Sequence, residues 1–181
     1  MKRLIKRICC LLMVVLMPCV CIGLTACEDI KELEVKISVY DTEANAQKDL
    51  TLTVDLYRHL APDTVDKILS YVEKGYYNDT LFFKDSFYTN AMLGDYKVVD
   101  GKIERNVADY VESIYGEFSA NGTAIKGDWK NEEGSIGLWR DWQADGSYNT
   151  NSDAAFNSGK ATWYIPSEAK TDYDGYFCVF G

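Results

Sequence analysis

Residues 75–95 of the chain have the sequence GYYNDTLFFKDSFYTNAMLGD. Aromatic residues are frequent in this stretch, its apolar runs are short, and Gly, Asn and Asp punctuate it. Leu81-Phe82-Phe83 has the composition of a buried β-strand, whereas Gly, Asn and Asp are typical of turns. The stretch therefore predicts short strands joined by loops rather than a helix.

A helix is predicted immediately upstream. Pro62 suits a first helical turn and Asp63 favours the positive N-terminal end of the helix dipole. Gly75 stands where a C-terminal cap belongs. Between them, apolar residues at helical spacing form one face, which predicts packing on a core. These residues are Val65, Ile68, Leu69 and Val72.

Two half-buried strands are predicted before the helix. Apolar and polar residues alternate from Leu33 to Val39 and again from Leu50 to Leu56. The polar stretch from Asp41 to Asp49 predicts the loop of a hairpin. Downstream, two further apolar runs predict buried strands. They are Trp163-Tyr164-Ile165 and Phe177-Cys178-Val179-Phe180. Strands with one clear helix and long loops indicate a mainly β domain, such as a β-barrel.

The order of these segments resembles the cyclophilin family of peptidyl-prolyl cis-trans isomerases over nearly all of residues 33–181. Gly94-Asp95 falls at the family's Gly-Asp without a gap from Gly75. The other similar motifs are Leu52-Thr53-Val54-Asp55-Leu56-Tyr57, Ala61-Pro62-Asp63-Thr64-Val65, Gly116-Glu117-Phe118, Gly134-Ser135-Ile136-Gly137-Leu138, Asn157-Ser158 with Trp163-Tyr164-Ile165, and Asp174-Gly175 with Val179-Phe180-Gly181. The resemblance implies a cyclophilin-like antiparallel β-barrel. The family continues past Val-Phe-Gly with a helix and a closing strand, which implies a C-terminally incomplete domain here.

The same resemblance implies catalysis of X-Pro isomerisation. Amide resonance makes rotation slow, with a barrier near 18–20 kcal/mol, and the two isomers differ by only about 1 kcal/mol. A catalyst therefore needs a hydrogen-bond donor aimed at the twisted nitrogen and an apolar pocket for the proline ring. This chemistry needs no nucleophile, metal or cofactor, and we expect none.

The catalytic positions of the family are largely substituted in this chain. Lys84 stands for the family's arginine, so we expect it to be the donor. Lysine keeps the charge but loses the planar fork, which predicts weak activity. Thr89-Asn90-Ala91-Met92 replaces Phe-Met-x-Gln. The mapping places these other residues at the substrate groove: Phe82, Phe83, Thr89, Asn90, Met92, Thr162, Tyr164 and Tyr173.

Trp139 and Arg140 offer a compensation. By the same mapping they follow Leu138, where the family's backbone lines the groove. One hypothesis is that Arg140 supplies the missing guanidinium and that Trp139 supplies an aromatic surface. The alternative is that Arg140 is a solvated surface cation.

The N-terminus predicts export. Four basic residues in the first seven precede an apolar run from Ile8 to Ile22, which is typical of a signal peptide. Leu24-Thr25-Ala26-Cys27 resembles the bacterial lipobox, in which the cysteine is lipidated. We expect residues 1–26 to be the signal, 27–32 the lipidated anchor and tether, and 33–181 the domain. Lipid on Cys27 would hold the protein on the outer side of a bacterial membrane.

Composition excludes several classes of function. The chain has 19 Lys and Arg against 28 Asp and Glu, a net charge of −9, and loss of the signal makes it more acidic. Such acidity argues against binding nucleic acid. Lipidation uses Cys27 and leaves Cys178 alone after the signal, so no disulfide framework is expected. His59 is the only histidine, so no zinc site is expected. The remaining cysteines lie in the signal: Cys9, Cys10, Cys19 and Cys21.

Two functions follow from this pattern. The first is an extracytoplasmic isomerase, anchored as a lipoprotein, that acts on X-Pro segments of secreted proteins. The alternative is a cyclophilin-fold module without catalysis that binds an extended peptide or a protein partner. Lys84, Asn90 and Thr162 favour the second function, and the general behaviour of the family favours the first. A lipoprotein domain recruited for an unrelated contact is a third possibility.

Overall fold

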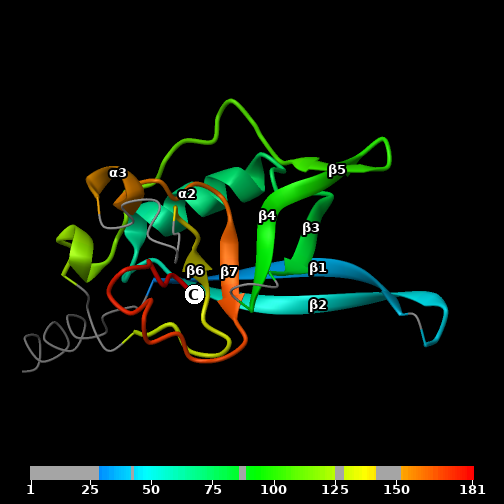
Figure 1. Cartoon of the computed structure of the whole chain (residues 1–181), viewed down its shortest axis with the longest axis horizontal. Coiled ribbons are helices and arrows are strands. Elements are labelled where there is room, and N and C mark those ends of the chain that lie inside the picture. Colours follow the sequence, from blue (N-terminus) through cyan, green and yellow to red (C-terminus); the bar gives the residue numbers. More distant parts are fainter. Residues whose placement is uncertain (1–28, 42, 86–88, 125–128, 142–151) are drawn as a thin grey trace, which may run out of the picture.

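The computed structural model describes residues 29–41, 43–85, 89–124, 129–141 and 152–181. The predicted signal and Cys27 lie outside these residues. Within them, no helix has both the length and the apolar character needed to cross a membrane. The fold is mainly β with one substantial helix, as the sequence predicts (Figure 1).

The first two strands form an antiparallel hairpin. β1 (Ile30–Asp41) pairs with β2 (Ala46–Tyr57), and the pairing of Leu33 with Val54 starts a row of apolar pairs on one face. Both strands are longer than predicted. β1 begins at Ile30, within the predicted tether, and β2 begins inside the predicted loop. At the turn end of the hairpin, backbone pairing continues although the side chains are largely exposed, as at Val39, because this end reaches out beyond the second sheet (Figure 1).

The helix α2 (Pro62–Glu73) begins and ends where the sequence predicts. Val65 and Ile68 are fully buried, and Tyr71 joins them on the same face. Gly75 has a φ of +73°, and its N–H donates to the carbonyl of Val72 over 2.9 Å, which caps the C-terminus.

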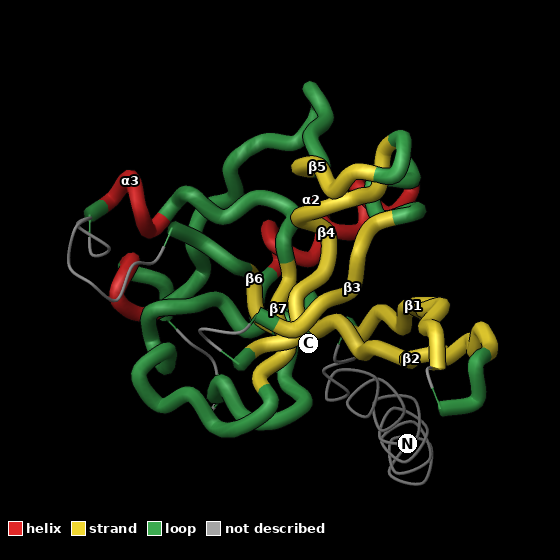
Figure 2. The backbone as a smooth tube through the Cα atoms, turned by 45° about the vertical axis from the view of Figure 1, so that its right-hand side comes forward, coloured by secondary structure: helices red, strands yellow, loops and turns green. Residues whose placement is uncertain are grey.

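The second sheet contains five strands, and most of the groove positions lie on it. Its order is β3-β4-β7-β6, with β5 also paired to β4. The strands are β3 (Thr80–Lys84), β4 (Asn90–Val99), β5 (Lys102–Arg105), β6 (Gly137–Leu138) and β7 (Trp163–Pro166). Two short helical segments, η1 (Ser119–Asn121) and α3 (Asp153–Phe156), lie in the loops. Figure 2 shows that long loops make up most of the rest.

The last residues of the chain connect the two sheets. The N–H of Tyr57 on β2 donates to the carbonyl of Phe180 over 2.8 Å, and Val179 forms a bridge with Gly137 on β6. The predicted strand from Phe177 to Phe180 is therefore an extended connector with a single bridge. The sheets do not close into a complete barrel in the part of the chain that the structure describes.

The main core lies between α2, the hairpin and one face of the second sheet. Ile68 of α2 and Leu56 of β2 pack with Trp163 of β7, and all three are buried. The side chain of Glu117 supports this arrangement, since its two oxygens accept from the backbone N–H groups of Asp63 and Thr64 at 3.1 and 2.8 Å. This carboxylate caps the helix N-terminus from a distant loop.

Candidate functional site

The register of the second sheet places several predicted groove residues on one face. Phe83 of β3 lies opposite Met92 of β4, Met92 lies opposite Tyr164 of β7, and Tyr164 lies opposite Gly137 of β6. Residues that pair directly across strands share a face of the sheet. This face points away from the main core, since the neighbouring residues Leu93 and Trp163 face the core.

A second hydrophobic cluster covers this outer face. We call it the aromatic cluster, and it consists of the buried residues Met92, Tyr164, Tyr173 and Phe177, with half-buried Phe83 and Trp139 beside them. Tyr173 and Phe177 stack with ring centroids 4.4 Å apart and an angle of 25°. Tyr164 meets both edge-on, at 5.7 and 5.6 Å. The cluster thus brings Phe83, Met92, Trp139, Tyr164 and Tyr173, all predicted groove residues, together.

Tyr164 is the centre of the aromatic cluster. Its side chain is fully buried, and its hydroxyl donates to the Oδ1 of Asn131. Burial raises the pKa of the Tyr164 hydroxyl well above its usual value, so the group stays neutral. Gly137 makes room for the ring, because a Cβ there would lie 2.2 Å from the Tyr164 ring. Asn131 carries no motif, so nothing in the sequence indicated its role.

Lys84, the predicted donor, projects from the opposite face of the same sheet. It lies opposite Ala91, which lies opposite Ile165, and Ile165 packs against the main core. Phe82 shares this face, and both side chains are exposed. Because β3 is the end strand of the sheet order, the flexible lysine stem can bend around it. Lys84 therefore reaches the aromatic cluster only around the edge of the sheet.

Thr89 and Asn90 stand where β4 begins. Thr89 has a φ of +61°, which is unusual for a β-branched residue. Its hydroxyl accepts from the ammonium of Lys170 over 2.9 Å, and its carbonyl accepts from the hydroxyl of Ser167 over 2.7 Å. Asn90 is fully buried and lies opposite Pro166. Both residues occupy predicted groove positions at the end of the aromatic cluster.

Arg140 is buried, with 3 % of its surface exposed, so the prediction of a solvated surface cation is wrong. Its Nε donates to the carbonyl of Tyr176 over 2.7 Å and its Nη1 to the carbonyl of Asp141 over 3.0 Å. The guanidinium lies over the rings of three residues at 4.7 to 5.5 Å, where cation–π attraction offsets its burial. Burial lowers the pKa of Arg140 to about 10, so it stays charged at neutral pH. The rings belong to Phe118, Phe156 and Phe177.

Thr162 and Trp139 border the same region. The backbone N–H of Trp139 donates to the carbonyl of Thr162 over 2.8 Å, which continues the pairing between β6 and β7. The Trp139 ring lies 5.6 Å from Phe177, so it packs on the edge of the cluster. Phe177 is a central member of the cluster that was not among the predicted groove residues.

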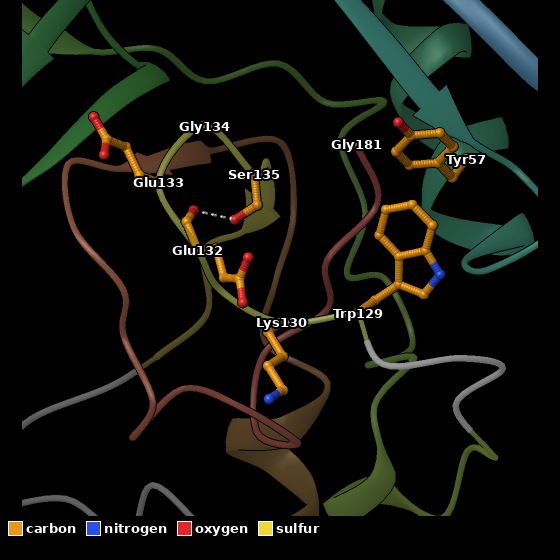
Figure 3. Close-up of a pocket in the computed structure, with 8 residues that line it drawn as sticks. All are labelled: Tyr57, Trp129, Lys130, Glu132, Glu133, Gly134, Ser135 and Gly181. Carbon is orange, nitrogen blue, oxygen red and sulfur yellow. Dashed lines mark hydrogen bonds between the residues drawn. The ribbon is translucent and has the colours of Figure 1, made fainter.

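A separate cavity of about 620 Å³ lies beside Tyr57, the last residue of β2, and Ser135, shortly before β6 (Figure 3). The rings of Tyr57 and Trp129 pack along one side with centroids 4.5 Å apart and an angle of 41° between their planes. Two carboxylates, Glu132 and Glu133, and the ammonium of Lys130 line the rest with Gly181. This cavity shares no residue with the aromatic cluster. Within the described ranges, no group of His, Cys, Asp and Glu side chains could hold a metal ion.

Comparisons with known proteins identify a family. The family model "Cyclophilin type peptidyl-prolyl cis-trans isomerase/CLD" matches residues 39–181. Among solved structures, the chain is similar to the cyclophilin AquaCyp293 from Hirschia baltica, with 15 % identity and a TM-score of 0.49. The alignment covers 85 % of this chain and 66 % of that one, so the chain spans slightly less than two thirds of its length. No curated protein sequence matches the chain.

Proposed function

The chain belongs to the cyclophilin-type peptidyl-prolyl cis-trans isomerase family, and from this premise we propose that it binds X-Pro segments of secreted proteins outside the cytoplasm and isomerises them slowly. The observation that carries this proposal is the aromatic cluster. Five positions that map to the family's groove meet on one sheet face, although they come from β3, β4, β7 and two loops. The half-buried rings of Phe83 and Trp139 offer the accessible apolar surface that a proline ring needs, and the buried members support them.

Slow catalysis follows from the place of Lys84. The donor must reach the twisted amide nitrogen to stabilise the transition state, and a fixed donor contributes most because it needs no reorganisation. Lys84 lies on the other face at the edge strand. To reach around the edge, Lys84 must hold a long side chain with several rotatable bonds in one conformation. This costs about 1.5–2 kcal/mol of conformational entropy. A family member with an arginine fixed on the groove face avoids this cost.

A binding module without catalysis is the second candidate function. The register that separates Lys84 from the aromatic cluster favours it, and so does the burial of Arg140, whose Nε and Nη1 already donate to backbone carbonyls. In this case the half-buried rings of Phe83 and Trp139 would hold an extended peptide, and no charged donor would act on its amide.

NMR exchange between the cis and trans isomers of an X-Pro peptide separates the two candidates. The full chain, purified in detergent, is compared with Lys84→Ala and with Lys102→Ala, which removes an exposed lysine from β5. Acceleration that is lost only in Lys84→Ala supports the slow isomerase. Peptide binding without acceleration supports the binding module, and absence of both overturns the two functions together.

The location outside the cytoplasm rests on the lipobox-like Leu24-Thr25-Ala26-Cys27 and the apolar run before it. Lipid on Cys27 would keep the domain near the point where secreted chains emerge. Cells fed an alkyne fatty acid should label the wild-type chain and Cys178→Ala, but not Cys27→Ala. Equal labelling of the two cysteine variants would contradict the anchor.

A further inference from the structure

Two buried asparagines near the aromatic cluster differ in their hydrogen bonding. Asn131 is 2 % exposed, and its carboxamide accepts from the Tyr164 hydroxyl and donates to Asp174 over 3.2 Å. Asn90 has no exposed surface, yet neither its Nδ2 nor its Oδ1 has a hydrogen-bond partner in the part of the chain that the structure describes. A buried amide without partners is rare in folded proteins and destabilises them.

Asn90 has two apolar neighbours in the sheet. It shares the outer sheet face with Met92, two residues along β4, and it lies opposite Pro166, which has no N–H to donate. Alternation along the strand thus points the Asn90 carboxamide to the side of the aromatic cluster. A leucine of nearly the same shape would suit such a place better, so packing alone does not account for the asparagine.

The residue before Asn90 is strained, and this is an independent observation. The φ of +61° at Thr89 costs energy because its β-branched side chain crowds the backbone there. Side chains from the segment after β7 hold it in place. Lys170 donates to the Thr89 hydroxyl, that hydroxyl lies 3.3 Å from a carboxylate oxygen of Glu168, and Ser167 donates to the Thr89 carbonyl. Strain and unpaired buried amides both concentrate at functional sites.

We propose that the Asn90 carboxamide is the polar anchor of the peptide site and pairs with a backbone peptide group of the ligand. This inference rests on the proposed function. A carboxamide offers one acceptor and a donor side by side, which match the N–H and C=O of a peptide group. The X-Pro amide itself has no N–H, so the group that pairs with Asn90 must flank it. Asn90 is therefore a positioning residue that sets the register of the proline on the aromatic cluster.

For a ligand to reach Asn90, the side chains that contact the neighbouring Thr89 would have to move. Glu168 is 67 % exposed, and its ion pair with Lys170 is 2.8 Å long. The Lys170 side chain is only 14 % exposed, so a peptide that replaces this pair must itself supply a partner for the Lys170 ammonium. The backbone hydrogen bond from Asp85 to the Asn90 carbonyl, 2.8 Å long, is not disturbed.

Stability measurements on matched variants test whether the Asn90 carboxamide contributes to the stability of the fold. In the full chain, Asn90→Leu should move the urea midpoint of unfolding upward, because it removes an unpaired buried amide at nearly constant shape. Asn131→Leu should move it downward, because it leaves the buried Tyr164 hydroxyl without its acceptor. A downward shift for both variants would mean that Asn90 serves the fold, and the proposal would be wrong.

Peptide binding tests the role. An X-Pro peptide is titrated into the ¹⁵N-labelled chain, and the Asn90 side-chain amide signal should shift. Asn90→Leu should weaken binding about tenfold, which corresponds to about 1.4 kcal/mol and one pair of hydrogen bonds. N-methylation of the peptide at one of the two groups that flank the X-Pro bond should weaken wild-type binding similarly and leave Asn90→Leu unaffected.

Three results overturn the inference in distinguishable ways. If the wild-type chain binds no X-Pro peptide, the proposed function fails and the anchor fails with it. If the wild type binds but Asn90→Leu binds equally well, only the anchor fails. If both methylated peptides lose affinity equally for the wild type and Asn90→Leu, the amide pairing is absent. The amide pairing is also absent if the affinity losses caused by Asn90→Leu and by N-methylation of the peptide simply add when the two changes are combined.

Discussion

The two faces of the β3-β4-β7-β6 sheet are built from different side chains. The core face carries Leu93, Leu138 and Trp163, which pack against α2 and the hairpin. The outer face carries Met92 and Tyr164 under the aromatic cluster. Both faces come from the same short strands, since Trp163 and Tyr164 are neighbours on β7, so alternation alone decides which side chain fills the core and which lies under the aromatic cluster.

Polar groups show the same division. On the core face the indole N–H of Trp163 donates to the Tyr77 hydroxyl over 2.8 Å, and Tyr77 donates to the carbonyl of Ala161 over 2.8 Å, so the polar chain is complete. On the outer face Tyr164 is paired with Asn131, but Asn90 is not paired among the described residues. The core face must fill a closed space, whereas the outer face keeps unusual groups that a partner could use.

Removal of the largest core-face ring should have the largest effect. Trp163 is 2 % exposed, so Trp163→Ala leaves a large cavity and should lower the free energy of unfolding by about 3–5 kcal/mol. Urea denaturation measures this. Trp129, which is 39 % exposed beside Tyr57, is the control, and Trp129→Ala should cost less than about 1 kcal/mol. Equal losses would mean that the core face does not dominate stability.

Arg140 contacts both the main core and the aromatic cluster, and its replacement should cause the second-largest loss of stability. Its guanidinium touches Phe118 and Phe156 of the main core and Phe177 of the aromatic cluster. Arg140→Met leaves the carbonyls of Tyr176 and Asp141 without this donor and should cost about 2–3 kcal/mol in urea denaturation.

The control for Arg140 is another arginine that pairs with an aromatic ring at the surface. The side chain of Arg105 is 66 % exposed and lies 4.8 Å from the Tyr96 ring, with an ion pair to Asp95. Arg105→Met should change stability by at most about 1 kcal/mol. A stability equal to wild type for Arg140→Met would mean that the hydrogen bonds and ring contacts of the guanidinium add no net stability.

The fold was largely predictable because its signals are local. Pro62, the helical spacing of Val65 and Ile68, and Gly75 together define α2 without knowledge of its neighbours. The hairpin follows from alternation, although its paired strands extend into the polar residues where alternation ends. Such signals depend on residues close in the sequence, so they can be recognised in a single sequence.

The site was predicted less well because it depends on distant contacts. The burial of Arg140 requires rings from Phe118, Phe156 and Phe177, which are far apart in the sequence. The place of Lys84 depends on the parity of the strand register, since a shift of one residue exchanges the two faces of a strand. A residue-by-residue mapping to a family does not contain this information. Asn131 has no sequence signal because only its tertiary contact with Tyr164 gives it a role.

The hydroxyl of Tyr164 should have a smaller effect on the outer face. Tyr164→Phe keeps the ring in the aromatic cluster but leaves the Oδ1 of Asn131 without its donor. The expected loss is about 1–2 kcal/mol in urea denaturation. Tyr115→Phe is the control, because Tyr115 is 49 % exposed and the carbonyl of Asn121, which it bonds, can turn to water. No difference between the two variants would mean that the buried pair adds nothing to the outer face.

The smallest effect concerns alkaline pH and the main core. Burial raises the pKa of the Cys178 thiol from 9.0 to about 12, and the charge of Glu117 adds to this. Below pH 9 the thiol is protonated in both the folded and the unfolded chain, so stability does not depend on it. Above pH 9 only the unfolded thiol ionises, and stability should fall until about pH 12. Between pH 9 and 10 the expected loss is about 1 kcal/mol.

Cys178→Ala provides the comparison, because it removes the ionisable group, whose sulfur lies 3.4 Å from the hydroxyl of the buried Thr64. The variant should be less stable at pH 8 and should show a smaller decline from pH 9 to 10 in urea titrations. The hydroxyls of Tyr76, Tyr77 and Tyr164 also have pKa values raised by burial, and unfolded tyrosines begin to ionise in this window, so these hydroxyls contribute the same decline to both proteins. An equal decline in both proteins would place the alkaline sensitivity on these tyrosines instead of on Cys178.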